Sequence, residues 1–192
     1  MHLIKIFMVT AAICLNTAQS VAQKLTQEKQ ILFTYGDFYP AEVSGYEIVV
    51  IESAHFDSED IAMLKQNNTT ILGYISLGEV NEAAAHFPEI KDFTFGKNKI
   101  WNSHILDIEN EETREALLAI FDYNMKKGLD GMFLDNIDNY TGFGRTPEKK
   151  EALIDFLKIL NVVYPNIHLM QNAGISILKD THPFIDSVAK ES

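Results

Sequence analysis

The sequence predicts an α/β fold of the (β/α)₈ TIM-barrel type that is incomplete, with about six strands present. Short apolar runs alternate with segments of helical periodicity, as parallel strands and their crossover helices do. Carboxylate and amide side chains stand where these runs end, which is the face of a barrel that holds the active site. No glycine-rich phosphate loop follows any run, which counts against the alternative, a nucleotide-binding doubly wound sheet.

The strands are predicted from runs that are apolar almost throughout, as expected where helices cover a parallel sheet. Two further segments are irregular. Residues 39–47 are too few for a full crossover helix, and residues 104–108 form an extra extended piece. The predicted strands comprise residues 31–35, 48–51, 70–77, 131–134, 167–170 and 185–189.

Three helices between these strands carry recognisable end signals. Asp57 offers an N-cap for the first helix, and Asn110 for the second, which Gly128 ends as a left-handed stop. Thr146 and Pro147 open the third helix. Their apolar stripes contain Ile61 and Leu64, then Leu117, Ile120, Phe121 and Met125, and then Leu153, Phe156, Leu157 and Leu160.

The first stretch of the chain has the three parts of a secretory signal peptide. Lys5 supplies the cation, residues 6–15 form a nearly continuous apolar run, and residues 20–22 are the small side chains that a signal peptidase requires. We therefore expect residues 1–22 to be removed and residues 23–192 to form one exported domain, secreted or periplasmic. The apolar run is shorter than the ~20 residues that a membrane-spanning helix needs, so no membrane span is expected.

Charge and residue usage exclude several classes of site. The formal net charge of −11 argues against a nucleic-acid partner and would suit a cationic ligand, although a solvated acidic surface explains it too. Cys14 is the only cysteine and lies in the predicted signal, so the mature chain has no thiol. The six histidines show no HExxH spacing, and Ile137 breaks a calcium-loop pattern. We expect no metal and no cofactor.

Asp135 is the leading candidate for chemistry because it ends an apolar strand. A buried carboxylate costs several kcal/mol unless it is paired or protonated. Asp138 lies three residues on, and two close carboxylates separate each other's pKa values, as an acid and a base require. The alternative is structural: Asp138 caps the next loop and Asp135 binds neighbouring backbone.

Other polar and aromatic residues stand at the same predicted face. Glu79 ends the run GYISLGE, where it either contacts substrate or serves as a capping or salt-bridged acid. Aromatic side chains near the strand ends could stack on sugar rings or simply pack; they are Tyr35, Tyr39, Trp101 and Tyr140. The strand-end polar residues are Asp37, Glu52, Glu79, Asp135, Asn172 and Glu191.

Several segments resemble the barrel of glycoside hydrolase family 114, the endo-α-1,4-polygalactosaminidases. The resemblance runs from about Ile31 to Ser192. Its most specific part is the combination of GYISLGE with GxDGxFLDxxDxY. The segments that carry it are YGDFYPAEVSGYEIVVIES, ILGYISLGEVNE, LDIENEETREALL and KGLDGMFLDNIDNY.

This resemblance implies an exported enzyme that cuts internal α-1,4 bonds in galactosamine-containing polysaccharide, a polycationic substrate that would suit the acidic chain. It implies Asp135 and Glu191 as the catalytic pair of a two-carboxylate mechanism. The final strands of the family barrel are absent, so the alternative is a truncated, non-catalytic pseudoenzyme or glycan-binding module. The expected substrate-binding residues are Tyr35, Asp37, Glu79, Asp138, Tyr140 and Asn172.

Overall fold

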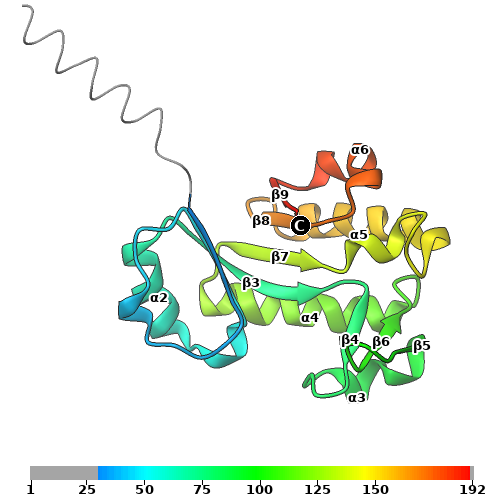
Figure 1. The fold of residues 1–192 in the computed structure, drawn as a ribbon, viewed down its shortest axis with the longest axis horizontal. Helices are drawn as coiled ribbons and strands as arrows, with labels where there is room; N and C mark the ends of the chain where they lie inside the picture. The colour runs from blue at the N-terminus through cyan, green and yellow to red at the C-terminus, as the bar shows by residue number, and fades with distance from the viewer. Residues whose placement is uncertain (1–29, 191–192) are drawn as a thin grey trace, which may run out of the picture. The chain divides into compact units, whose positions relative to one another are not determined.

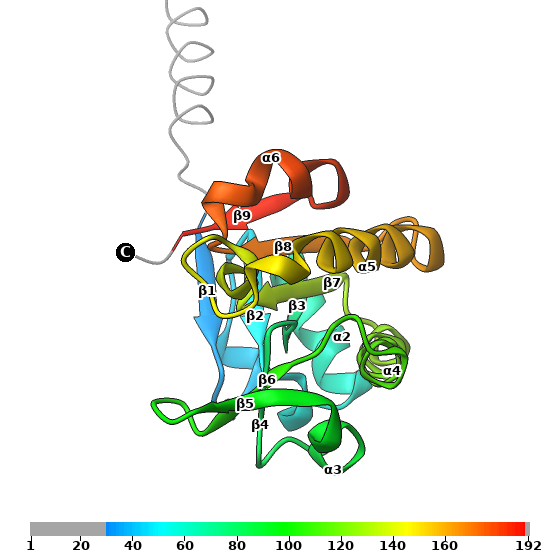
Figure 2. The ribbon, with the colours of Figure 1, turned by 90° about the vertical axis from the view of Figure 1, so that its right-hand side faces the viewer.

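The computed structural model describes residues 30–190, and a six-stranded parallel sheet forms their centre. The strands follow one another in the order β1-β2-β3-β7-β8-β9, and each pairs in parallel with its neighbours. The sheet curls into a half-barrel (Figures 1 and 2), which confirms the predicted incomplete barrel. The bounds are β1 Ile31–Thr34, β2 Ile48–Ile51, β3 Thr70–Ser76, β7 Gly131–Asp135, β8 His168–Asn172 and β9 Ser187–Ala189.

The helices begin and end largely where the sequence predicts. Asp57 accepts hydrogen bonds from two backbone amides of α2 (Ser58–Asn67), and Asn110 caps α4 (Glu111–Lys127). Gly128 ends α4 with a φ of 97°, a conformation that glycine adopts without strain. The third helix, α5 (Lys150–Val163), begins later than Thr146, because a 3₁₀ turn at Pro147–Lys149 precedes it. A short helix, α6 (Leu178–Thr181), follows β8.

Side chains alternate between the two faces of the curled sheet, as strand geometry requires. Met132 and Leu134 of β7 pack on one face in a core that includes Leu117 of α4 and Phe156 of α5. Phe133 points to the other face, where it belongs to a separate cluster. That second cluster consists of Ile48, Val50, Leu72, Phe133 and Met170.

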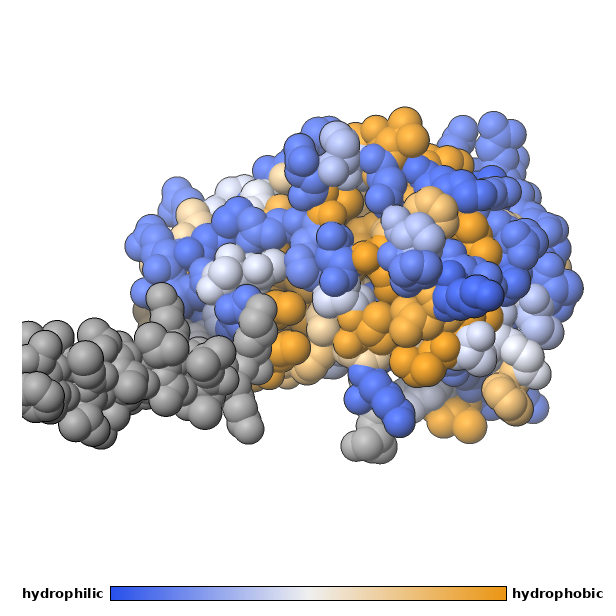
Figure 3. Space-filling model, turned by 90° about the horizontal axis from the view of Figure 1, so that it is seen from above, coloured by the Kyte–Doolittle hydropathy of each residue, from blue (hydrophilic) through white to orange (hydrophobic). Residues whose placement is uncertain are grey.

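Some apolar side chains of the described residues stay exposed. Ile31 and Phe33 of the edge strand β1 are each 40% exposed, although the Phe33 ring contacts that of Phe133 at a centroid distance of 5.3 Å. Viewed from above, apolar surface gathers between hydrophilic areas (Figure 3). The open edge of the half-barrel therefore leaves part of the β1 side chains in contact with solvent.

The residues between β3 and α4 in the sequence form a second, antiparallel sheet. Its strands β4 (Glu79–Asn81), β6 (Ser103–Leu106) and β5 (Thr94–Asn98) run in the order β4-β6-β5, with the short helix α3 (Phe87–Ile90) beside them. The extra extended piece predicted near 104–108 is the central strand of this sheet. Figure 1 shows the small sheet beyond the arrowheads of β3 and β7.

The sequence predicts the third strand over residues 70–77 with Glu79 at or just past its end, and in the structure Glu79 lies just past β3 but begins a strand of the second sheet. Pairing of β3 with β7 stops at Ser76, which lies opposite Asp135, and Glu79 begins β4. The chain departs at Gly78, where an added Cβ would lie 2.6 Å from the carbonyl oxygen of Asn136. Only glycine allows this close approach, so the chain leaves β3 packed directly against the turn that follows β7.

The predicted signal peptide and the boundary at residue 23 lie outside the described residues. Within residues 30–190, no helix is long and apolar enough to cross a membrane. The segment 39–47 contains a 3₁₀ turn at Pro40–Glu42 instead of a crossover helix, as its length predicts.

Candidate active site

Asp135 ends β7 with a hydrogen-bond donor on each of its carboxylate oxygens. The Tyr74 hydroxyl donates to Oδ2 at 2.8 Å, and the Asn172 Nδ2 donates to Oδ1 at 2.9 Å. Tyr74 is on β3 and Asn172 ends β8, the strands on either side of β7. The register sets Ser76 beside Asp135, and it sets Phe133 beside both Tyr74 and Met170. All of these side chains therefore lie on the same face, so two neighbouring strands orient the acid.

Tyr74 is the partner of Asp135 that sequence reasoning missed. Burial, and then the charge of Asp135 and the hydrogen bond to it, raise the pKa of the Tyr74 hydroxyl well above its usual range. The phenol therefore stays protonated and donates at any physiological pH. Strand parity was the signal that could have identified it, because Tyr74 lies two residues before Ser76 and shares the inward face.

Tyr35 stands next to this pair, directly after the last residue of β1. Its ring meets the Tyr74 ring edge-on at a centroid distance of 5.2 Å, and 45% of its surface is exposed. Tyr35 therefore combines a fixed aromatic contact with an accessible face. This is the placement that a sugar-stacking side chain requires.

The turns after β7 and β8 adopt the left-handed conformation at residues that are not all glycine. Asn136 follows Asp135 with a φ of 58°, and Ala173 follows Asn172 with a φ of 54°. Such residues cost of order 1–3 kcal/mol and cluster at functional sites. The Ser76 hydroxyl donates to Asn136 Oδ1 at 2.6 Å, which holds the first turn in place. The strain lies directly beside the two hydrogen-bonded side chains.

The Glu79 carboxylate is buried, with 7% of the residue exposed, and neutral donors surround it. Asn98 Nδ2 and Asn139 Nδ2 donate to it at 3.1 and 3.2 Å, and the Ser103 hydroxyl donates as well. Neither of the predicted structural alternatives, a helix cap or a salt bridge, describes this arrangement. Its hydrogen-bonding capacity is largely used inside the protein, whereas a role in substrate contact stays a prediction.

Asp138 and Tyr140 lie on one 3₁₀ turn, Ile137–Tyr140, but in different surroundings. Asp138 is exposed, and its pKa is raised first by partial desolvation and then by the charges of Asp135 and Glu79. Tyr140 is 1% exposed and belongs to the core, where its hydroxyl donates to the carbonyl of Leu77 at 2.6 Å. The predicted contact of Tyr140 with substrate therefore has no accessible surface, whereas that of Asp138 does.

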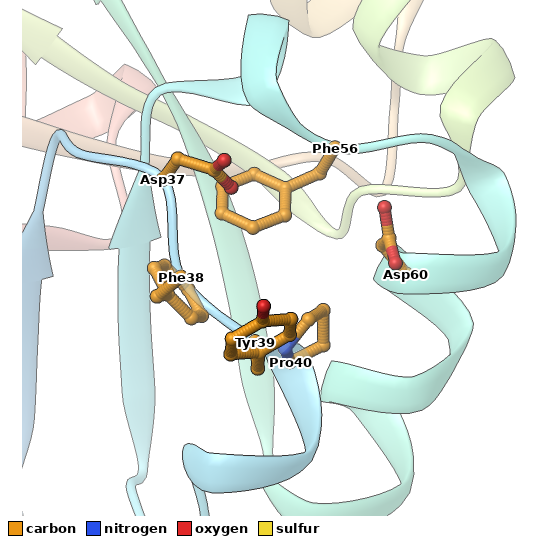
Figure 4. Close-up of a pocket in the computed structure, with 6 residues that line it drawn as sticks. All are labelled: Asp37, Phe38, Tyr39, Pro40, Phe56 and Asp60. Carbon is orange, nitrogen blue, oxygen red and sulfur yellow. The ribbon is translucent and has the colours of Figure 1, made fainter.

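Asp37 lines a separate pocket beyond β1, with a volume of about 320 Å³. Its exposed carboxylate and the half-buried carboxylate of Asp60 lie near the aromatic rings of the pocket (Figure 4). Asp60 also accepts a hydrogen bond from the Asp57 backbone at 3.1 Å, as part of the capping box of α2. The lining residues are Asp37, Phe38, Tyr39, Pro40, Phe56 and Asp60.

Glu52 and Glu191 complete the predicted strand-end set. Glu52 caps the 3₁₀ turn Ser53–His55 by accepting a hydrogen bond from the Ala54 amide at 3.3 Å. Glu191 lies outside the described residues, so its predicted pairing with Asp135 stays a prediction. Among residues 30–190, no three histidine, cysteine, aspartate or glutamate side chains form a group that could hold a metal ion.

A family model described as glycoside-hydrolase family GH114 matches residues 11–192. The chain belongs to family GH114. This confirms the resemblance that the motifs indicate and places the chain in a family of glycosidases. No curated protein matches the sequence.

Solved structures resemble this GH114 chain over most of its described length. The glycoside hydrolase domain of PelA from Pseudomonas aeruginosa is 29% identical, with a TM-score of 0.76 over 85% of this chain and 67% of that one. Ega3 of Aspergillus fumigatus, in complex with galactosamine, is 22% identical, with a TM-score of 0.71 over 84% of this chain and 65% of that one. The GH114 chain thus spans about two thirds of each.

More distant barrels share the fold alone. An α-galactosidase of Thermus thermophilus in complex with stachyose is 11% identical, with a TM-score of 0.58 over 85% of this chain and 43% of that one. These likenesses confirm the incomplete (β/α) barrel as the fold of the GH114 chain. The cluster of Asp135, Tyr74 and Asn172 therefore lies at the end of the strands where barrel enzymes hold their active sites.

Proposed function

We propose that this GH114 chain is an exported glycoside hydrolase that cleaves internal α-1,4 bonds in galactosamine-containing polysaccharide, with Asp135 and Glu191 as its catalytic pair. The observation that carries the proposal is the Asp135 carboxylate, which two adjacent strands orient at the carboxyl end of a barrel sheet. Family membership supports the reaction class. The galactosamine complex of Ega3 and the formal charge of −11 support a cationic amino-sugar substrate.

The two-carboxylate mechanism assigns a different protonation state to each acid. An ionised carboxylate only accepts hydrogen bonds, whereas a protonated one must also donate. Both oxygens of Asp135 already accept, from Tyr74 and Asn172, which suits the ionised form. In this proposal Asp135 acts as the carboxylate that stabilises the sugar cation or activates water, and Glu191 protonates the leaving glycosidic oxygen.

Asp135→Asn is the decisive variant. The purified chain is incubated with partly deacetylated galactosaminogalactan, and new reducing ends are followed over time. We expect Asp135→Asn to lower the rate by at least about 10³-fold, because the amide cannot supply the negative charge. Asp122→Asn, on the solvent side of α4, is the matched control and should keep wild-type activity.

Two outcomes would contradict this function. A folded wild-type chain that releases no more reducing ends than Asp135→Asn is not a hydrolase of this substrate. Oligosaccharide binding without turnover, together with a cooperative melt, would instead indicate a glycan-binding module. Intact mass of the exported product checks the accompanying proposal of a signal peptide removed before Gln23.

A further inference from the structure

Trp101 lies in the turn between β5 and β6 and presents an indole to solvent. The residue is 72% exposed, and its neighbour Ile100 is 82% exposed. The turn belongs to the small sheet beyond the carboxyl ends of β3 and β7 (Figure 1). Figure 2 looks onto those strand ends and shows the turn between β5 and β6 extending toward the side of β1. A large apolar tip thus stands at the rim of the candidate active-site face.

The backbone on both sides of this tip is tied to the buried acid Glu79. Asn98 and Ser103 pair across β5 and β6 and flank the turn, and both side chains donate hydrogen bonds to the Glu79 carboxylate. The Ile100 amide donates to Asn98 Oδ1 at 3.1 Å, which closes the turn from within. These hydrogen bonds therefore hold the turn between β5 and β6 in one conformation.

A separate contact holds the carbonyl of Trp101 itself. Asn81 Nδ2, at the end of β4, donates to the Trp101 carbonyl at 3.1 Å. The neighbouring Asn102 Nδ2 donates to Glu82 at 3.3 Å, although the Asn102 backbone is left-handed, with a φ of 51°. These five hydrogen bonds thus hold the turn beneath an indole that itself faces water.

The chemistry of an exposed, braced indole matches a carbohydrate ring. The apolar C–H face of a pyranose stacks on an aromatic surface, and a protonated amine attached to it is further attracted by the indole π-face. Packing does not explain the exposure, because a tryptophan side chain gains free energy only when its apolar area is covered. A polysaccharide covers such a tip without enclosing it.

The geometry points to Trp101 as a sugar-stacking platform that binds a hexosamine unit of the polysaccharide away from the cleaved bond, with Glu79 as the positioning residue beneath it. This inference rests on the proposed function for its ligand class. It assigns Glu79 an indirect role, since the carboxylate acts through Asn98 and Ser103. The platform should favour long chains, which reach both Asp135 and Trp101, over short ones.

Trp101 is the only tryptophan in the chain, so intrinsic fluorescence reports on this tip alone. The full chain carrying Asp135→Asn is titrated with long and with short partly deacetylated α-1,4-galactosamine oligosaccharides. We expect the long oligosaccharides to shift the emission and to shield the indole from iodide quenching. Unchanged emission at saturation, with binding established by calorimetry, overturns the platform. An emission shift with lipid vesicles and none with oligosaccharide also overturns it.

Kinetics separate the platform from the hydrolase proposal. Trp101→Ala should raise the KM for polymer by about tenfold and leave kcat and the KM for short oligosaccharides unchanged. Trp101→Phe should retain most of the affinity, and Val162→Ala, an exposed apolar position on α5, is the matched control. Hydrolysis with an unchanged KM in Trp101→Ala overturns the platform alone. A fluorescence response without any hydrolysis overturns the proposed activity and leaves the platform standing.

The positioning role of Glu79 has its own readout. Glu79→Gln puts an amide group, itself a donor, opposite the donors Asn98 and Ser103, so the turn should become more mobile. The fluorescence anisotropy of Trp101 should then fall, and the KM should rise for polymer but not for short oligosaccharides. Asn81→Ala removes an exposed tie to the same turn and should act in the same direction, which keeps the test valid if Glu79→Gln fails to fold. Unchanged fluorescence anisotropy in folded Asn81→Ala contradicts the proposal that these hydrogen bonds hold Trp101 in place.

Discussion

At the scale of single residues, the acid at the end of β7 is defined by what reaches it from the adjacent strands. Tyr74 stays protonated because burial and the neighbouring charge raise its pKa. Its hydroxyl and the Asn172 amide both point at Asp135. A carboxylate with a charge-assisted hydrogen bond on each oxygen has little freedom to rotate. Its orientation is therefore set before substrate arrives.

Tyr74→Phe tests this orientation directly. The change removes the hydroxyl and its 2.8 Å bond to Asp135 and keeps the aromatic ring. We expect kcat on polymer to fall by about 10- to 100-fold, as when other supporting hydrogen bonds of a reactive group are lost. Tyr123→Phe, on the exposed side of α4, is the control. Full activity in Tyr74→Phe would show that Asn172 alone suffices to hold the acid.

At the scale of elements, the small sheet is as informative as the barrel strands. A cluster around Glu82, which directly follows β4, links the three strands of this sheet. The Glu82 carboxylate accepts a hydrogen bond from the Lys97 ammonium of β5 at 2.7 Å, and it lies 2.8 Å from His104 Nε2 of β6. These contacts, the one with His104 first, lower the pKa of Glu82 to about 2. The Glu82 cluster thus connects β4, β5 and β6 next to the turn that carries Trp101.

The Glu82 cluster predicts a pH dependence of stability. Because the folded pKa of about 2 lies below the ordinary value of 4.5, Glu82 stabilises the fold above pH 4.5, and the contribution disappears as the pH falls toward 2. Melting temperatures of wild type and Glu82→Gln should therefore differ near pH 6 and converge near pH 2. A difference that is constant over this range would contradict the linkage.

Gly131 shows how closely two barrel strands approach each other. An added Cβ would lie 1.8 Å from the carbonyl oxygen of His168, which is backbone and cannot rotate away. Gly131→Ala should separate β7 from β8 and destabilise the protein by about 1–3 kcal/mol or more, measured by urea denaturation. Gly142→Ala is the matched control, because nothing lies within 4 Å of its added Cβ. Equal stability of the two variants would disprove the tight contact.

At the scale of the whole molecule, the sequential strand order explains why the site could be anticipated. Parallel strands that follow one another in space bring their carboxyl ends to one rim, so a polar residue after each apolar run marks that rim. Asp135 and Asn172 satisfy this rule directly. Glu79 does not, because the chain leaves β3 at Ser76 and returns as a strand of a different sheet.

The sequence by itself determined the α/β class, the helix ends at Asp57, Asn110 and Gly128, the family, and Asp135 as the candidate acid at the end of a barrel strand. These follow from local rules, namely hydrophobic periodicity, capping chemistry and short motifs. Only the tertiary structure decided which side chains contact Asp135 and which donors bind the Glu79 carboxylate. It also decided that Tyr140 is buried whereas Trp101 is exposed. Such facts depend on register and on contacts between residues far apart in the chain, which no local pattern encodes.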